Sequence, residues 1–351
     1  MKPLSVIRQR LRARVRVLLF LLAGATLISF LFFSLPTFQL STPATMADCP
    51  LFPPDNVWNA RVDSLPVDAR SDAYVSSIGI TATLHPNFGA KTWQGSPIGI
   101  PYTTVLGTQP LVPIHFVAYG HESDPGPYPI PPDAPIEGGA DAGGDRHVIV
   151  VDRDNCILYE LYRAFPNADG SWNADSGAKF DLRSHALRPA GWTSADAAGL
   201  PILPGLARYD EVASGEIRHA LRFTATNIQE NYIWPARHLF PADPTLNLPP
   251  YGQRFRLKAS FDISGFSPQT QVILTALKTY GLILADWGTA WYISGVPDPG
   301  WDDHALVSEL ESIAGSNFEA VDESSLMVDP NSGRVRSPLD RFWLWLPIIH
   351  K

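Results

Sequence analysis

A histidine and a glutamate form the first pair of residues in this chain that could do chemistry. Two strand-like runs, HVIVV at residues 147–151 and CILYELY at residues 156–162, flank a short polar turn. This pattern predicts a β-hairpin in which His147 lies directly opposite Glu160, with their Cβ atoms about 5 Å apart. A histidine beside a carboxylate can share a proton with it and act as a general acid or base. The alternative interpretation is a plain structural contact between the two strands.

A second histidine could join this pair as a catalytic candidate. Residues 216–225, EIRHALRFTA, alternate between polar and apolar side chains and place His219 on the apolar face of a strand. If both strands line one groove, His219 converges with the His–Glu pair; otherwise it is a core histidine. Arg218 and Arg222 share the opposite face, where either could neutralise an acidic sugar.

Carboxylates near the expected strand ends and loops offer a second chemistry. Glycoside hydrolysis uses two Asp or Glu side chains about 5–10 Å apart across a sugar ring. The candidates are Glu160, Asp196, Asp262 and Asp286. Indole rings could bind the sugar beside them, because its CH face stacks on aromatic rings, although many tryptophans serve the core instead. The indoles selected as substrate-binding candidates are Trp234, Trp287 and Trp291.

Other chemistries lack their sequence signals. The nine histidines and two cysteines form no H-x-x-x-H, H-E-x-x-H or Cys/His cluster, and no G-x-S-x-G or phosphate-binding motif occurs. We therefore expect no metal, no cofactor and no nucleotide. Residues 48–351 contain 21 basic and 35 acidic residues, because the first 47 hold six of the 27 cations and no acid, which gives a net charge of −14. So acidic a chain is unsuited to nucleic acid.

The N-terminus predicts export. Six cations and no acid occupy residues 2–16, and residues 17–35 carry no charge, which is typical of a bacterial export signal. The apolar run could cross roughly 30 Å of hydrocarbon as an uncleaved anchor, whereas Thr45-Met46-Ala47 suits cleavage after Ala47. The expected parts are a signal or anchor with tether (1–47), one extracytoplasmic domain (48–328) and a C-terminal tail (329–351).

The cysteine count agrees with export from the cytoplasm. Cys49 and Cys156 are both in the exported part, and two cysteines in an oxidising compartment predict one disulfide. The bond would close a loop of about 108 residues and contribute on the order of 4–5 kcal/mol through loop entropy.

The remaining patterns predict a mainly β protein with short helices (α+β class), built as an antiparallel β-sandwich or a jelly-roll-like fold. One helix is expected to begin after Ser267, with Pro268 in its first turn, and to end at Gly281. Another is expected over residues 302–313. Proline-rich and glycine-rich stretches between residues 125 and 144 predict a long loop, and such loops often shape a site.

Two stretches resemble a family of exported bacterial proteins of unknown function. They are residues 52–88 and residues 186–225, the second reading ALRPAGWTSADAAGLPILPGL…GEIRHALRFT. The likeness continues through WPARH, GQRFRLKASFDISGF and GLILADWG and covers most of residues 50–326. It implies an exported bacterial protein and carries no activity with it.

Together these features suggest an enzyme that cleaves extracellular polysaccharide or cell-wall glycan by acid/base chemistry, as a glycoside hydrolase or a polysaccharide lyase. His147 and His219 would be the acid/base candidates, Glu160 would orient or share the proton, and Asp286 is a further candidate. The alternative is a non-catalytic cell-surface protein that binds glycan or supports the envelope. Residues 17–35 would hold either one in the membrane if they are not removed.

Overall fold

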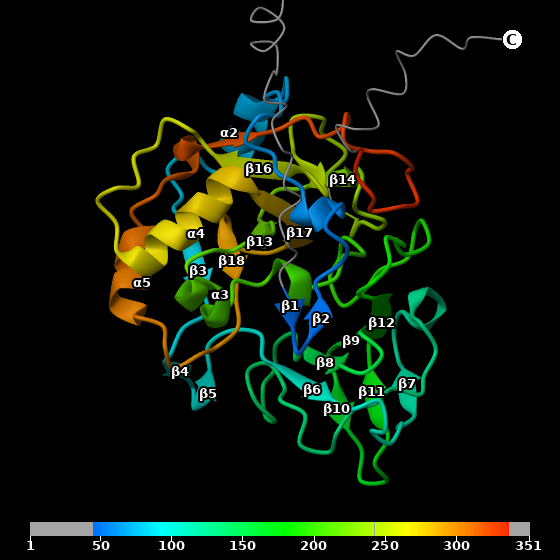
Figure 1. The fold of residues 1–351 in the computed structure, drawn as a ribbon. Coiled ribbons are helices and arrows are strands. Elements are labelled where there is room, and N and C mark those ends of the chain that lie inside the picture. Colours follow the sequence, from blue (N-terminus) through cyan, green and yellow to red (C-terminus); the bar gives the residue numbers. More distant parts are fainter. Residues whose placement is uncertain (1–44, 242, 337–351) are drawn as a thin grey trace, which may run out of the picture. The chain divides into compact units, whose positions relative to one another are not determined.

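The computed structural model describes residues 45–241 and 243–336. The apolar run of residues 17–35 and the last residues of the expected tail lie outside these ranges. Within them, no helix is both long and apolar enough to cross a membrane. Figure 1 shows a six-stranded sheet with its helices in the upper part of the view and a four-stranded sheet in the lower part.

The four-stranded sheet contains the predicted hairpin. Its strands, in spatial order, are β12 (Ser176–Asp181), β9 (Ile157–Tyr162), β8 (Val148–Asp152) and β6 (Tyr102–Val105). The hairpin of β8 and β9 is confirmed, but the predicted register is wrong by two residues, because Ile149 lies opposite Glu160. Asp152 continues the strand, and its carboxylate accepts hydrogen bonds from the turn N–H groups of Asp154 and Asn155. A shift of two keeps His147 on the same sheet face as Glu160.

The six-stranded sheet mixes parallel and antiparallel pairs. Its strands, in order, are β19 (Phe318–Ala320), β16 (Arg254–Leu257), β17 (Leu282–Trp287), β13 (Leu221–Ala225), β18 (Tyr292–Ser294) and β3 (His85–Asn87). The pairs β13–β17 and β18–β3 are parallel, as is β6–β8 in the other sheet. The β-rich α+β class is therefore confirmed, but the sheets are not those of an antiparallel sandwich.

Four helices accompany these sheets in the described ranges. They are α2 (Ser71–Ile78), α3 (Tyr209–Ser214), α4 (Pro268–Thr279) and α5 (Asp303–Leu310). Both predicted helices are confirmed, and α4 begins at Pro268 and buries Ile273, Leu274 and Leu277 in the core. Short elements complete the fold: β1 (Thr45–Met46), β2 (Cys49–Pro50), β4 (Thr92–Trp93), β5 (Ser96–Pro97), β7 (Ile114–Phe116), β10 (Phe165–Pro166), β11 (Trp172–Ala174), β14 (Gln229–Tyr232), β15 (Pro250–Tyr251), and the 3-10 turns η1 (Val57–Asn59), η2 (Gly120–Glu122), η3 (Leu203–Gly205) and η4 (Gly315–Asn317).

The predicted disulfide is confirmed. Cys49 in β2 and Cys156, directly before β9, are bonded, with their Cα atoms 5.4 Å apart and 107 positions apart in sequence. Both cysteines are buried in the main core, so the bond fixes the start of the domain to the four-stranded sheet.

Replacing both cysteines with serine should lower the free energy of unfolding by about 4–5 kcal/mol, because the unfolded chain then regains the entropy of a long open loop. Urea unfolding of the wild type and the Cys49→Ser/Cys156→Ser variant measures the difference. Reduced wild-type protein is the matched control and should lose the same amount. A loss below about 1 kcal/mol would contradict the loop-entropy argument.

Candidate functional site

A loop between the two sheets organises the candidate site. This loop, residues 193–203 and called the connecting segment below, contacts both sheets. On the side of the four-stranded sheet, the N–H groups of Ile202 and Leu203 donate hydrogen bonds of 2.9–3.0 Å to the Glu160 carboxylate. Burial raises the pKa of Glu160 to about 7, although the two N–H donors act in the opposite direction. Glu160 has no exposed surface, so it can act on a substrate only through other groups.

His147 bonds to a different glutamate from the one expected. Its Nδ1 lies 2.6 Å from a carboxylate oxygen of Glu137, and its Nε2 lies 3.0 Å from the carbonyl oxygen of Ala195 in the connecting segment. Burial alone would lower the pKa of His147, but the charge of Glu137 overrides this effect and raises it to about 9. Burial likewise would raise the pKa of Glu137, but His147 lowers it below its ordinary value. The two side chains therefore form an ion pair.

The ion pair of His147 and Glu137 should make stability depend on pH. Because the pKa of His147 rises from 6.5 to about 9 on folding, its contribution is complete below pH 6.5 and is lost as the pH rises through 9. Each pKa unit corresponds to about 1.4 kcal/mol, so the stability advantage of wild type over Glu137→Gln should shrink by on the order of 3 kcal/mol between pH 6 and pH 10. Urea unfolding at both pH values measures it.

The matched control for this experiment is Glu216→Gln. Glu216 pairs with Arg218 at the surface, and an arginine does not titrate over this range. Its effect should be small and equal at both pH values. If the difference in free energy of unfolding between wild type and Glu137→Gln is the same at both pH values, the charge of His147 does not contribute to stability in the way proposed.

On the side of the six-stranded sheet, the connecting segment supplies Asp196. Both carboxylate oxygens of this buried residue accept hydrogen bonds from Arg222 in β13, at 2.8 and 2.9 Å. A third guanidinium nitrogen of Arg222 donates to the Ser294 hydroxyl in β18. Such a bidentate pair holds both side chains in one orientation.

Asp286 completes the cluster at the end of β17. Its carboxyl group shares a hydrogen bond with Asp196 and lies 3.9 Å from the Arg222 guanidinium. Burial, followed by the neighbouring Asp196 carboxyl, raises the pKa of Asp286 well above that of an ordinary aspartic acid. About a quarter of the Asp286 side chain (26 %) is exposed. Asp286 therefore keeps its proton to a higher pH than an ordinary aspartic acid does, and solvent can reach it.

A row of cross-strand neighbours runs from Asp286 along the sheet. The register places Asp286 beside Thr224, Thr224 beside Tyr292, and Tyr292 beside His85, across β17, β13, β18 and β3. An irregularity between β13 and β17 brings Asp286 opposite Thr224, on the face that carries Arg222. Three strand spacings separate the ends of the row by roughly 14 Å.

A cavity of about 490 Å³ lies at the His85 end of this row. Its lining includes Glu137, His85, Asn87, Tyr292 and Trp93. The His85 and Tyr292 rings are stacked, with centroids 4.3 Å apart, and Trp93 is 72 % exposed. Glu137 thus faces the cavity on one side and bonds to buried His147 on the other. Sequence reasoning missed Glu137, although it located the long loop in which this residue lies.

Three further candidate residues lie apart from this cluster. His219 is fully buried, and its ring nitrogens bond to Glu211 and to the carbonyl oxygen of Ala220, at 3.0 and 2.8 Å. It does not join His147, so the expected convergence is not found. Asp262 lies in an exposed turn, where it accepts a hydrogen bond from the Ser264 N–H group. Arg218 is occupied by its pair with Glu216.

The three tryptophans occupy three different environments. Trp287 follows Asp286 and is 61 % exposed, so its ring is open to solvent. Trp234 is half-buried, and its indole N–H donates to the Ser332 carbonyl. Trp291 corrects the sequence expectation, because its ring is fully buried between Phe223 and Phe318. No face of Trp291 is open to a ligand.

Within residues 45–241 and 243–336, no cluster of His, Cys, Asp and Glu side chains is arranged to hold a metal ion. Comparisons with protein-family models, with curated proteins and with solved structures gave no match.

Proposed function

We propose that this protein is an extracytoplasmic enzyme that cleaves polysaccharide by acid/base chemistry. One observation carries the proposal: Asp286 and Glu137 are partly exposed carboxyl groups whose pKa values are displaced in opposite directions, and both interact electrostatically with Arg222. Opposed displacements of this kind separate an acid from a base within one site. Asp286 is then the general acid, and Glu137 is the carboxylate that assists the attacking group. Both carboxyl groups interact with the same Arg222 guanidinium, so Glu137 lies nearer to Asp286 than His85 does at the far end of the row.

In this mechanism the proton of Asp286 passes to the bridging glycosidic oxygen as the bond from that oxygen to the anomeric carbon breaks. Water then completes the hydrolysis, either activated by Glu137 as a base or after Glu137 has attacked as a nucleophile, and the stereochemistry of the product distinguishes these two routes. His147 acts as a positioning residue for Glu137, and Asp196 holds the proton on Asp286. Aromatic surface for sugar stacking is available at Trp287, at one end of the row.

Hydrolysis is favoured over lyase chemistry by the arginines. A lyase acts on acidic sugars and must neutralise their carboxylate, the task expected of Arg218 or Arg222. Both are already paired with protein carboxylates. A location outside the cytoplasm is supported by the Cys49–Cys156 disulfide, because disulfides persist in oxidising compartments. The basic and apolar N-terminus supports the same location, with residues 17–35 holding the protein in the membrane if they are retained.

A polysaccharide turnover screen tests the proposal. Full-length protein in detergent is incubated with neutral and acidic polysaccharides, and both reducing ends and the absorbance of unsaturated sugars are followed. New reducing ends without unsaturated products are expected. Unsaturated products would instead indicate a lyase. Retention of the protein in a polysaccharide gel without any product would favour the non-catalytic glycan-binding alternative.

A further inference from the structure

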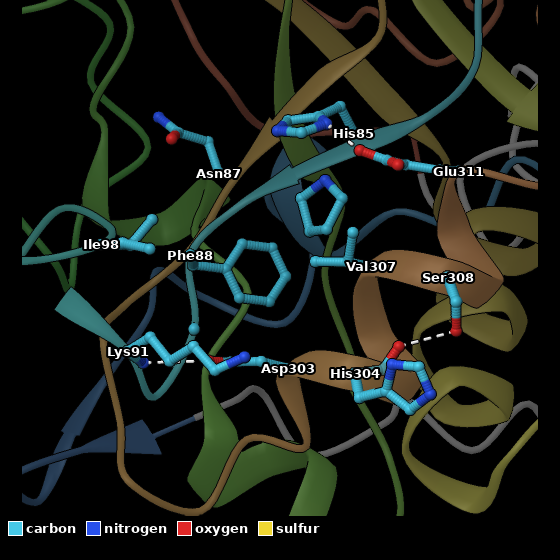
Figure 2. Close-up of a pocket in the computed structure, with 12 residues that line it drawn as sticks. His85, Asn87, Phe88, Lys91, Ile98, Asp303, His304, Val307, Ser308 and Glu311 are labelled. Carbon is cyan, nitrogen blue, oxygen red and sulfur yellow. Dashed lines mark hydrogen bonds and ion pairs between the residues drawn. The ribbon is translucent and has the colours of Figure 1, made fainter. Parts of the chain in front are cut away.

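A second cavity adjoins the first one at β3. It has a volume of about 540 Å³ and is formed between β3 and α5, as Figure 2 shows. It shares His85, Asn87 and Ile98 with the cavity that contains Glu137. Strand β3 is therefore a common wall, and the two cavities adjoin along it.

The second cavity has an apolar floor and a polar rim. In Figure 2 the side chains of Phe88 and Val307 lie in the middle of the site, with His85, Glu311 and Asp303 around them. Val307 is 37 % exposed, although it lies in a helix whose other apolar residues, Leu306 and Leu310, are buried. A sugar ring has the same two-sided character, with apolar CH faces and a polar edge of hydroxyl groups.

The rim favours an uncharged ligand. Glu311 is paired with His85 at 2.6 Å, and the Asp303 carboxylate accepts hydrogen bonds from the N–H groups of Ala90 and Lys91, at 2.7 and 3.0 Å. Both carboxylates already have hydrogen-bond partners within the protein. Their negative charge would still repel an acidic polymer. With Glu137 in the first cavity, three carboxylates line the two cavities, and the cationic side chain of Lys91 is the opposing charge.

We infer that the two cavities are successive subsites of one groove across β3, and that the groove binds an extended, neutral polysaccharide chain. Each cavity lies within the range of about 300–1,000 Å³ usual for small-molecule sites, so a single sugar does not fill both. This inference rests on the proposed function and adds to it the class of substrate, a neutral polymer held in both cavities.

Affinity electrophoresis with the full-length protein tests the inference independently of catalysis. The gels contain soluble xylan, mixed-linkage β-glucan or polygalacturonate. We expect a neutral polysaccharide to retard the wild type, Val307→Trp to weaken that affinity tenfold or more by filling the second cavity, and polygalacturonate to retard neither protein. Val328→Trp is the matched control, because Val328 is also exposed and lies outside both cavities. Ser308→Trp, from the same cavity wall, repeats the block if Val307→Trp fails to fold.

The turnover screen, run in parallel, separates the two proposals. If Val307→Trp and Ser308→Trp bind and cleave as well as wild type, the second cavity is not a subsite, although the enzyme assignment stands. If the wild type binds a neutral polysaccharide through this cavity but cleaves nothing, the groove stands and the enzyme assignment fails. Stronger retardation by polygalacturonate would overturn the neutral-substrate inference, and an absence of both binding and turnover would overturn both proposals.

Discussion

Asp286→Asn is expected to reduce polysaccharide turnover by roughly 10²–10⁴-fold, the usual contribution of a general acid. Asparagine has the same shape but no transferable proton, so the leaving oxygen departs without protonation. The fold should survive, because the amide can still donate a hydrogen bond to Asp196, the partner of Asp286 in the wild type. Initial rates of reducing-end release from the best polysaccharide of the screen measure the effect, and urea unfolding checks stability.

Asp262→Asn is the control for this experiment, since it makes the same chemical change in an exposed turn outside the cluster. It should cleave at the wild-type rate. The pH profile offers a second test of Asp286. Because the acid must be protonated and its pKa is raised, activity should extend to higher pH than the ordinary pKa of about 3.9 would permit. Full activity in Asp286→Asn would remove this residue from the mechanism.

Short sequence patterns were sufficient to predict several elements of the fold. The helix that begins at Pro268, the β8–β9 hairpin and the disulfide each depend on short stretches or on a count of two cysteines, and all three are present. The hairpin register was wrong because the strand alternation tolerates a shift of two residues. The capping bonds of Asp152 settle that choice, and alternation alone contains no information about them.

Strand partners and the site depended on information that local patterns do not hold. The parallel pair β13–β17 joins segments about 60 positions apart, and alternation does not specify which strands meet. One signal was present, since residues 282–285 are apolar and fully buried, as in a parallel strand. The sequence places Asp196 and Asp286 near loops, but their meeting at Arg222 depends on the connecting segment, which lies between the sheets.

The partner of His147 could likewise not be predicted from local sequence patterns. The hairpin pattern predicts that His147 lies beside Glu160, but the structure pairs His147 with a different carboxylate. The partner is Glu137, which lies in an irregular loop rather than on the facing strand. Loops carry no periodicity from which a contact could be derived, so Glu137 could be anticipated only as part of a long loop that shapes a site.

Arg222→Met should be the most destabilising substitution in the cluster, lowering the free energy of unfolding by about 3–5 kcal/mol. Arg222 and Asp196 are almost completely buried, and their bidentate pair is the link between β13 and the connecting segment. Methionine fills similar space but leaves Asp196 and Asp286 facing each other without a cation. The two carboxylates then repel each other, and protonation of Asp286, whose pKa is already raised, relieves that repulsion. The loss should therefore be smaller at pH 4.5 than at pH 8.

Two comparisons in urea unfolding decide whether this loss comes from the buried charge. Arg218→Met removes an arginine that pairs with Glu216 at the surface, and such pairs contribute at most about 1 kcal/mol. The double variant Arg222→Met/Asp196→Leu removes both buried charges and should be more stable than Arg222→Met alone, because no unpaired carboxylate of Asp196 is left behind. The single variant Asp196→Leu is measured as well. If the double variant loses, relative to wild type, the sum of the losses of Arg222→Met and Asp196→Leu, the two residues act independently. The connecting segment would then be held by its contacts to Glu160 and His147 rather than by the Arg222–Asp196 pair.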